Sequence, residues 1–146
     1  MNLAMALLRA DAAAELLNNA DSALPPTTKD RFVQMKQELM TQELGPTGRW
    51  FSYLQLYYAT VHVVIRTWQR GHLGNTVVDE LLANEEIVEM VTDFRDDLMH
   101  GGAFLGDEIA RFFGHSREIE TWSNQLRQSC GQHVVKFFAT PRTGPG

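Results

Sequence analysis

With 146 residues, 44% of them hydrophobic and 10% aromatic, the chain can bury a core as one domain without metal or disulfide support. Its single cysteine, Cys130, excludes an internal disulfide, and its longest apolar region, residues 57–65, is far too short to cross a membrane. The net charge is −5, and the apolar residues 1–8 lack the preceding basic residue of a signal peptide, so we expect a soluble cytoplasmic protein.

Apolar residues recur with the helical period along most of the chain, and no strand-like alternation persists, which predicts an all-α fold. The first expected helix covers residues 2–19, which are rich in alanine and leucine, and it ends before Pro25. Thr28 can cap a second helix over residues 29–44. Its expected apolar stripe is Phe32, Met35, Leu39 and Met40.

The third expected helix, residues 49–70, has the longest apolar stripe and should be the central, most buried element. Its inward positions are Phe51, Leu54, Tyr58, Val61, Ile65 and Trp68, and Tyr57, Val63 and Val64 should widen this stripe. After a turn, residues 77–83 form a short helix or a helical lead-in. Asn84 can then cap a helix over residues 85–100, which the glycine pair at 101–102 ends.

Two further helices complete the expected fold. Residues 105–113 form a short helix, and Ser116 can cap a last long helix that runs to about residue 138. Its inward residues are expected to be Ile119, Trp122, Leu126, Cys130, His133 or Val134, and Phe137. The sum is an up-and-down bundle of four or five main helices in a single domain, residues 1–138, with a flexible tail at 139–146.

The segment with the clearest chemical potential is Arg95-Asp96-Asp97-Leu98-Met99-His100. A guanidinium can hold a phosphate through two hydrogen bonds, and an imidazole can transfer a proton near pH 7. On a continuous helix Arg95 and His100 would point about 140° apart. If the helix ends at the glycines, His100 can swing back toward Arg95, and the pair would suit metal-independent cleavage of RNA by the ribose 2′-hydroxyl.

This motif, late in an all-helical domain of this size, resembles the HEPN superfamily (higher eukaryote and prokaryote nucleotide-binding domains). The family signature is an arginine, usually followed by a polar residue, and a histidine after a spacing of four to six. Arg95, Asp96 and His100 match these positions. The resemblance implies a helical bundle that dimerises, and a ribonuclease of the kind found in toxin–antitoxin and other defence systems.

The resemblance also gives each residue an expected role. Arg95 would hold the phosphate, His100 would transfer the proton, and Asp96 would orient one of them. A homodimer formed at this helix end would supply a second copy of each group. The substrate would be RNA, and neither a cofactor nor a metal would take part.

The distribution of charge along the chain favours a different function. Residues 71–110 contain ten acidic residues and only one basic residue, Arg95, so the segment carries −9 and the rest of the chain +4. An acidic surface weakens binding to nucleic acid and suits a basic protein. The alternative function is therefore a non-catalytic interaction module, a degenerate HEPN scaffold that binds a regulatory protein partner through the acidic face from Asp79 to Glu89.

Other candidate sites are incomplete in the sequence. Asp97 and His100 have the spacing of a helical metal site, but no second pair exists to complete it. Cys130 and His133 likewise lack a second pair for zinc. We expect His62, which lies among valines, to be a satisfied core or interface histidine, and most of the aromatic residues to belong to the core rather than to stack on bases.

Overall fold

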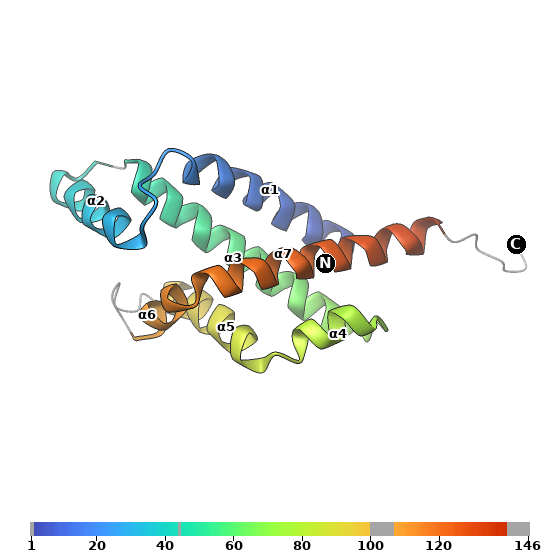
Figure 1. Ribbon diagram of the computed structural model, residues 1–146. Helices are drawn as coiled ribbons and strands as arrows, with labels where there is room; N and C mark the ends of the chain where they lie inside the picture. Colours follow the sequence, from blue (N-terminus) through green and yellow to red (C-terminus); the bar gives the residue numbers. More distant parts are fainter. Residues whose placement is uncertain (1, 44, 100–106, 140–146) are drawn as a thin grey trace, which may run out of the picture.

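The computed structural model describes residues 2–43, 45–99 and 107–139. These residues form seven helices and no strand, so the prediction of an all-α bundle is confirmed (Figure 1). The helices are α1 (Leu3–Asp21), α2 (Thr28–Thr41), α3 (Pro46–Gly71), α4 (Thr76–Leu82), α5 (Glu85–Met99), α6 (Asp107–Gly114) and α7 (Ser116–Ala139). The five longest have at least 14 residues, which matches the four or five main helices expected.

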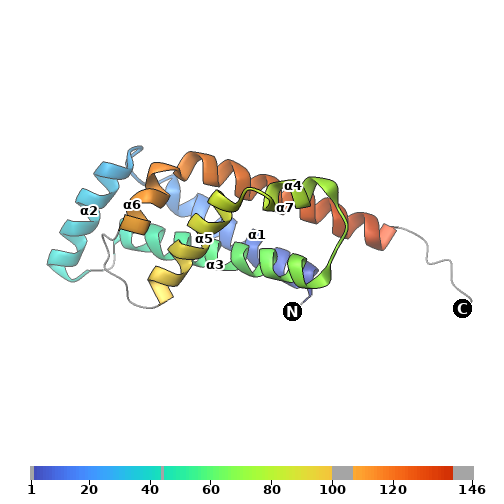
Figure 2. The ribbon, with the colours of Figure 1, turned by 90° about the horizontal axis from the view of Figure 1, so that it is seen from below.

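Helix α3 is the centre of the bundle. The contact between α1 and α3 is the most extensive between any two of the described helices, and α5 also packs on α3. Helix α7 lies against α1 and α4, α6 joins α5 to α7, and α2 lies across one end of α3 (Figure 2). None of the described helices combines the length and apolar character that a membrane span needs.

The helix starts follow from local capping. Asn84 accepts a hydrogen bond from the backbone N–H of Ile87 at 3.3 Å, as predicted. The cap of α2 is Thr27 rather than Thr28, and its hydroxyl accepts from the N–H of Asp30 at 3.2 Å. Helix α3 starts earlier than expected, at Pro46, because proline has the φ angle and the missing N–H that suit a first helical position.

The core forms mainly around α3. All six of its main predicted inward residues are buried, and so are Ala6, Ala10 and Ala13 of α1, the helix that packs most extensively on α3. Because these side chains are small, the two helices can approach closely over most of the length of α1. At the other side of α3, Phe94 of α5 stacks on Phe112 of α6 with ring centroids 4.0 Å apart. This packing fixes α5, and with it the position of Arg95.

Two predicted apolar stripes are only partly buried. In α2, Met35 is buried, but Leu39 and Met40 are 65% and 76% exposed, because only one face of this helix reaches the end of α3. In α7, Phe137 is 62% exposed rather than inward-facing. The reason is visible in Figures 1 and 2, where the C-terminal turns of α7 run past the ends of α1 and α3.

Candidate functional site

Two of the three predicted site residues, Arg95 and Asp96, lie near the end of α5. The Nη1 of Arg95 donates a hydrogen bond to the Oδ1 of Asp96 at 3.1 Å, and the two side chains are 35% and 47% exposed. His100 lies outside the described residues, as do the glycines that were expected to end the helix. The structure therefore brings Arg95 and Asp96 together and leaves the Arg95–His100 geometry as a prediction.

Arg95 lines an open groove between α5, α3 and the start of α1. From α3 the groove receives His62, Arg66 and Arg70, and from α1 it receives Asn2 and Leu3. The three basic residues of α3 are spaced by four, so they lie on one face of the helix, one turn apart. Sequence reasoning missed Arg66 and Arg70, although this regular spacing was a visible signal.

The groove has a surplus of positive charge. No carboxylate in the described part of the chain forms an ion pair with Arg66 or Arg70, and the ion pair that Arg95 forms there is with Asp96. Two acidic residues from the segment around Arg95 are engaged elsewhere. Asp79 accepts a hydrogen bond from the indole of Trp68 at 3.0 Å, and Glu89 pairs with Arg111 at 3.0 Å. Arg66 and Arg70 therefore add positive charge beside Arg95 that a count over residues 71–110 does not include.

His62 is buried beside these arginines, with 6% of its surface exposed. Its burial was expected, but the expectation that its hydrogen bonds are satisfied is wrong, because its Nδ1 is buried with no partner among the described residues. Burial lowers the pKa of His62, and the positive charges of Arg95 and Arg66 lower it further, against a smaller opposite effect of Asp96. The imidazole is therefore neutral near pH 7.

This lowered pKa predicts a pH dependence of stability. Below the ordinary value of 6.5 the unfolded chain takes up a proton at His62 that the folded protein does not, so the free energy of unfolding falls with the pH until the folded-state pKa is reached. Urea titrations between pH 7.5 and 5 should show this loss. His62→Gln should reduce it, whereas His72→Gln, at an exposed helix end, should not. Equal pH slopes for wild type and His62→Gln would contradict the prediction.

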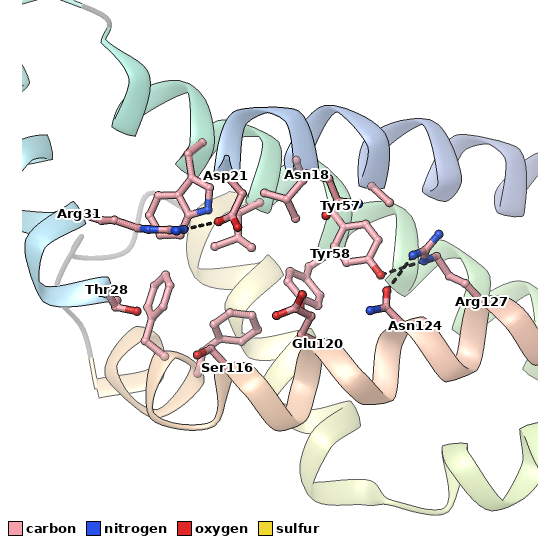
Figure 3. Close-up of a pocket in the computed structure, with 16 residues that line it drawn as sticks. Asn18, Asp21, Thr28, Arg31, Tyr57, Tyr58, Ser116, Glu120, Asn124 and Arg127 are labelled. Atoms are coloured by element: carbon pink, nitrogen blue, oxygen red, sulfur yellow. Dashed lines mark hydrogen bonds and ion pairs between the residues drawn. The ribbon is translucent and has the colours of Figure 1, made fainter. Parts of the chain in front are cut away.

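A second hollow, shown in Figure 3, is a cavity of about 160 Å³ bounded by α1, α2, α3, α6 and α7. Its floor is aromatic, and its two ends hold arginines that are already paired. Arg31 bonds to Asp21 and lies 4.9 Å from the centroid of the Trp50 ring. Arg127 bonds to Asp11 at 2.7 Å. These ion pairs join α1 to α2 and to α7, which indicates a structural role.

Tyr57 links the interior of this cavity to α7. Its hydroxyl donates to the Oγ of Ser123 at 2.9 Å and accepts from the Nε of Arg127 at 2.9 Å. Tyr57→Phe removes both bonds and leaves the Nε of Arg127 without this acceptor, although Ser123 keeps its bond to the carbonyl of Glu120. We therefore expect a loss of about 1–3 kcal/mol in the free energy of unfolding, measured by urea titration. Tyr53→Phe is the matched control, because Tyr53 lies on the same helix with only part of its side chain buried. A loss of equal size in the control would refute the role given to the network.

In the described part of the chain, none of the remaining candidate residues forms a functional site. Burial raises the pKa of the Cys130 thiol to about 12, so it is not a nucleophile near pH 7. The ring of His133 packs against Trp68, with centroids 4.9 Å apart. Among the described residues, no three His, Cys, Asp or Glu side chains gather as a metal ion would require, and the side chain of Asp97 and all of His100 fall outside that set.

In the described structure, the groove is thus the place where a predicted site residue lies beside further side chains that could bind a ligand. It joins Arg95 to two arginines and a buried, unsatisfied histidine. Comparison of the chain with family models, with curated proteins and with solved structures returns no match in any of the three.

Proposed function

We propose that this protein is a metal-independent endoribonuclease of the HEPN type that acts in a defence or toxin–antitoxin system. One observation carries the proposal: Arg95 lines a groove whose other charged side chains, Arg66 and Arg70, are positive and unpaired within the described residues. In a protein of net charge −5, this is a surface to which a polyanion would be attracted.

Arg95 is suited to hold the phosphate that reacts. Its side chain is about one-third exposed and lines the groove, so a phosphodiester there can reach it. Arginine binds phosphate through two parallel hydrogen bonds and stabilises the charge that develops on the oxygens in the transition state. The bond to Asp96 uses one of the five guanidinium donors and leaves others free for the phosphate.

His100 would move the protons. In the proposed reaction the ribose 2′-oxygen attacks phosphorus, its proton passes to a neutral imidazole, and the bond from phosphorus to the 5′-oxygen breaks. The departing 5′-oxygen takes a proton from an imidazolium, so the products are a 2′,3′-cyclic phosphate and a 5′-hydroxyl. Because one histidine begins as base and another as acid, a homodimer with two copies of His100 suits this scheme.

The test is cleavage of single-stranded RNA by purified protein in excess EDTA. Cleavage that persists in EDTA, produces 2′,3′-cyclic phosphate ends and fails on the same RNA with 2′-O-methyl groups would support the proposal. An Arg95→Ala sample purified in parallel controls for contaminating nuclease. Cleavage that requires a divalent metal, or the absence of cleavage of several RNAs by folded wild-type protein, would overturn it.

A second candidate is the non-catalytic interaction module. It is favoured by the exposed carboxylates of Glu80, Glu85 and Glu86, which have no ion pair in the described part of the chain. They give α4 and the start of α5 an acidic face that would suit a basic protein. Folded protein that cleaves no RNA would favour this function over the enzyme.

A further inference from the structure

The groove beside Arg95 carries more positive charge than contact with one phosphodiester requires. Arg66 and Arg70 are exposed on α3, and each lies one turn from the next basic residue of the series that begins with His62. Arg95 comes to the same groove from α5. Among the described side chains, Arg95 is paired with Asp96, whereas Arg66 and Arg70 have no ion pair, which leaves two uncompensated positive charges.

The first turn of α1 adds to this field. Asn2 and Leu3 line the groove, so the N-terminal end of a 19-residue helix borders the same groove as the arginines. Asn2 caps the helix by accepting from the N–H of Met5 at 2.9 Å. The N–H groups of the first turn have no acceptor within a helix, and the helix dipole places about half a positive charge there. Oxyanions bind at such ends.

His62 provides an independent indication of a polar ligand. The residue is 94% buried, it lines the groove, and its Nδ1 has no hydrogen-bond partner among the described residues. A buried polar atom without a partner is costly, and most such atoms in native structures are satisfied. Arg95 and Arg66 are the two positive groups that act most strongly on this imidazole, so it belongs to the same cluster.

We propose that His62, Arg66, Arg70 and the first turn of α1, beside the Arg95 that would hold the reacting phosphate, form a binding site for a terminal phosphate, that is, a phosphomonoester. The charge of the ligand distinguishes a phosphomonoester from the phosphodiester of an internal RNA linkage. A phosphomonoester carries a charge near −2 at neutral pH, because its second pKa is about 6, and this balances the two uncompensated positive charges. A phosphodiester has about half that charge.

The substrate that this implies is RNA with a terminal phosphate, and in this respect the inference rests on the proposed function. The same chemistry is present in a free nucleoside monophosphate, which is a second source of the group. In RNA, the end bound by Arg66 and Arg70 would fix the distance to the bond that is cut. In a mononucleotide, the phosphate alone would account for binding.

Binding is measured on an RNA that cannot be cut, so that cleavage does not affect the result. Fluorescence anisotropy would compare labelled 2′-O-methyl octanucleotides with a 5′-phosphate, with a 3′-phosphate and with no terminal phosphate. We expect one phosphorylated form to bind wild type at least about tenfold more tightly than the unphosphorylated form, as new charge-assisted hydrogen bonds require. A nucleoside monophosphate that competes as well as the octanucleotide would identify the mononucleotide as the ligand.

The variants are Arg66→Ala with Arg70→Ala, and Arg117→Ala as the control. Arg66 and Arg70 are exposed, so their loss should leave the urea midpoint unchanged, and the preference for the phosphorylated end should disappear. Arg117 is also exposed but lines a different hollow, so its loss should leave the preference intact. Equal binding of all three octanucleotides by wild type, or a preference that survives in the double variant, would overturn the proposal.

This experiment separates the two proposals. If the protein prefers a phosphorylated end but cleaves no RNA in EDTA, the phosphate site stands and the ribonuclease proposal fails. If it cleaves RNA but binds the three octanucleotides equally, the ribonuclease stands and the phosphate site fails.

Discussion

Replacing Arg95 with alanine is expected to lower the initial rate of RNA cleavage in EDTA by about a hundredfold or more. The substitution removes the donors that hold the phosphate and stabilise its developing charge, and loss of one such group costs at least about 2.7 kcal/mol of transition-state stabilisation in comparable sites. Arg95→Lys keeps the charge but cannot form the bidentate contact, so we expect a rate between wild type and alanine. The measurement is the rate on an end-labelled RNA.

The fold should tolerate this change, which makes the rate interpretable. Arg95 is partly exposed and contacts Asp96 within one surface pair, so its loss should shift the free energy of unfolding by less than about 1 kcal/mol. Arg117→Ala is the matched control for removing an exposed arginine. A rate in Arg95→Ala equal to that of wild type would exclude Arg95 from catalysis, and the interaction module would then be the better account.

The sequence predicted the members of the Arg95 site that are local and missed those that are distant. Arg95 and Asp96 are adjacent in the chain, so their contact needs no tertiary information. Arg66 and Arg70 come from another helix, and their regular spacing with His62 shows only that they share a face. Which surface that face meets depends on how α5 and the start of α1 pack on α3.

A count of charge along the chain likewise does not show which charged residues come together in the fold. Residues 71–110 are strongly acidic, and on that basis Arg95 appeared poorly placed to attract RNA. In the fold, Glu89 pairs with Arg111 of α6, and Arg95 meets basic residues that belong to the positive remainder of the chain. The charge near a site is a property of the surface, and distant segments contribute to it.

Periodicity was a better guide to the centre of the fold than to its ends. The six main positions of the α3 stripe are all buried, because a central helix has neighbours along most of its length, and only Val63 at the edge of the stripe is exposed. Leu39 of α2 and Phe137 of α7 fit the same kind of pattern but are exposed. An apolar stripe shows which face a helix would bury, whereas the positions of its neighbours decide how much of that face is covered.

The largest effect on stability is expected for Phe94→Ala. Phe94 is fully buried, stacks on Phe112 at 4.0 Å and contacts Phe51, Tyr58 and Phe113 edge to face, with centroids 6.1–6.3 Å apart. Removing a buried ring of this kind costs about 3–5 kcal/mol, a large part of the 5–15 kcal/mol that holds a typical domain folded. Urea titration should show a much lower midpoint or an unfolded protein.

Phe138→Ala is the matched control, because it removes the same ring from a side chain that is 71% exposed, and we expect a change within about 0.5 kcal/mol in the free energy of unfolding.

Phe94→Leu should lose less stability than Phe94→Ala and remain folded, so it can test whether the aromatic cluster also affects cleavage. Since Arg95 follows Phe94 directly, the aromatic cluster sets the direction in which Arg95 leaves α5. Cleavage by folded Phe94→Leu should fall below wild type, and an unchanged rate would mean that the position of Arg95 does not depend on this cluster.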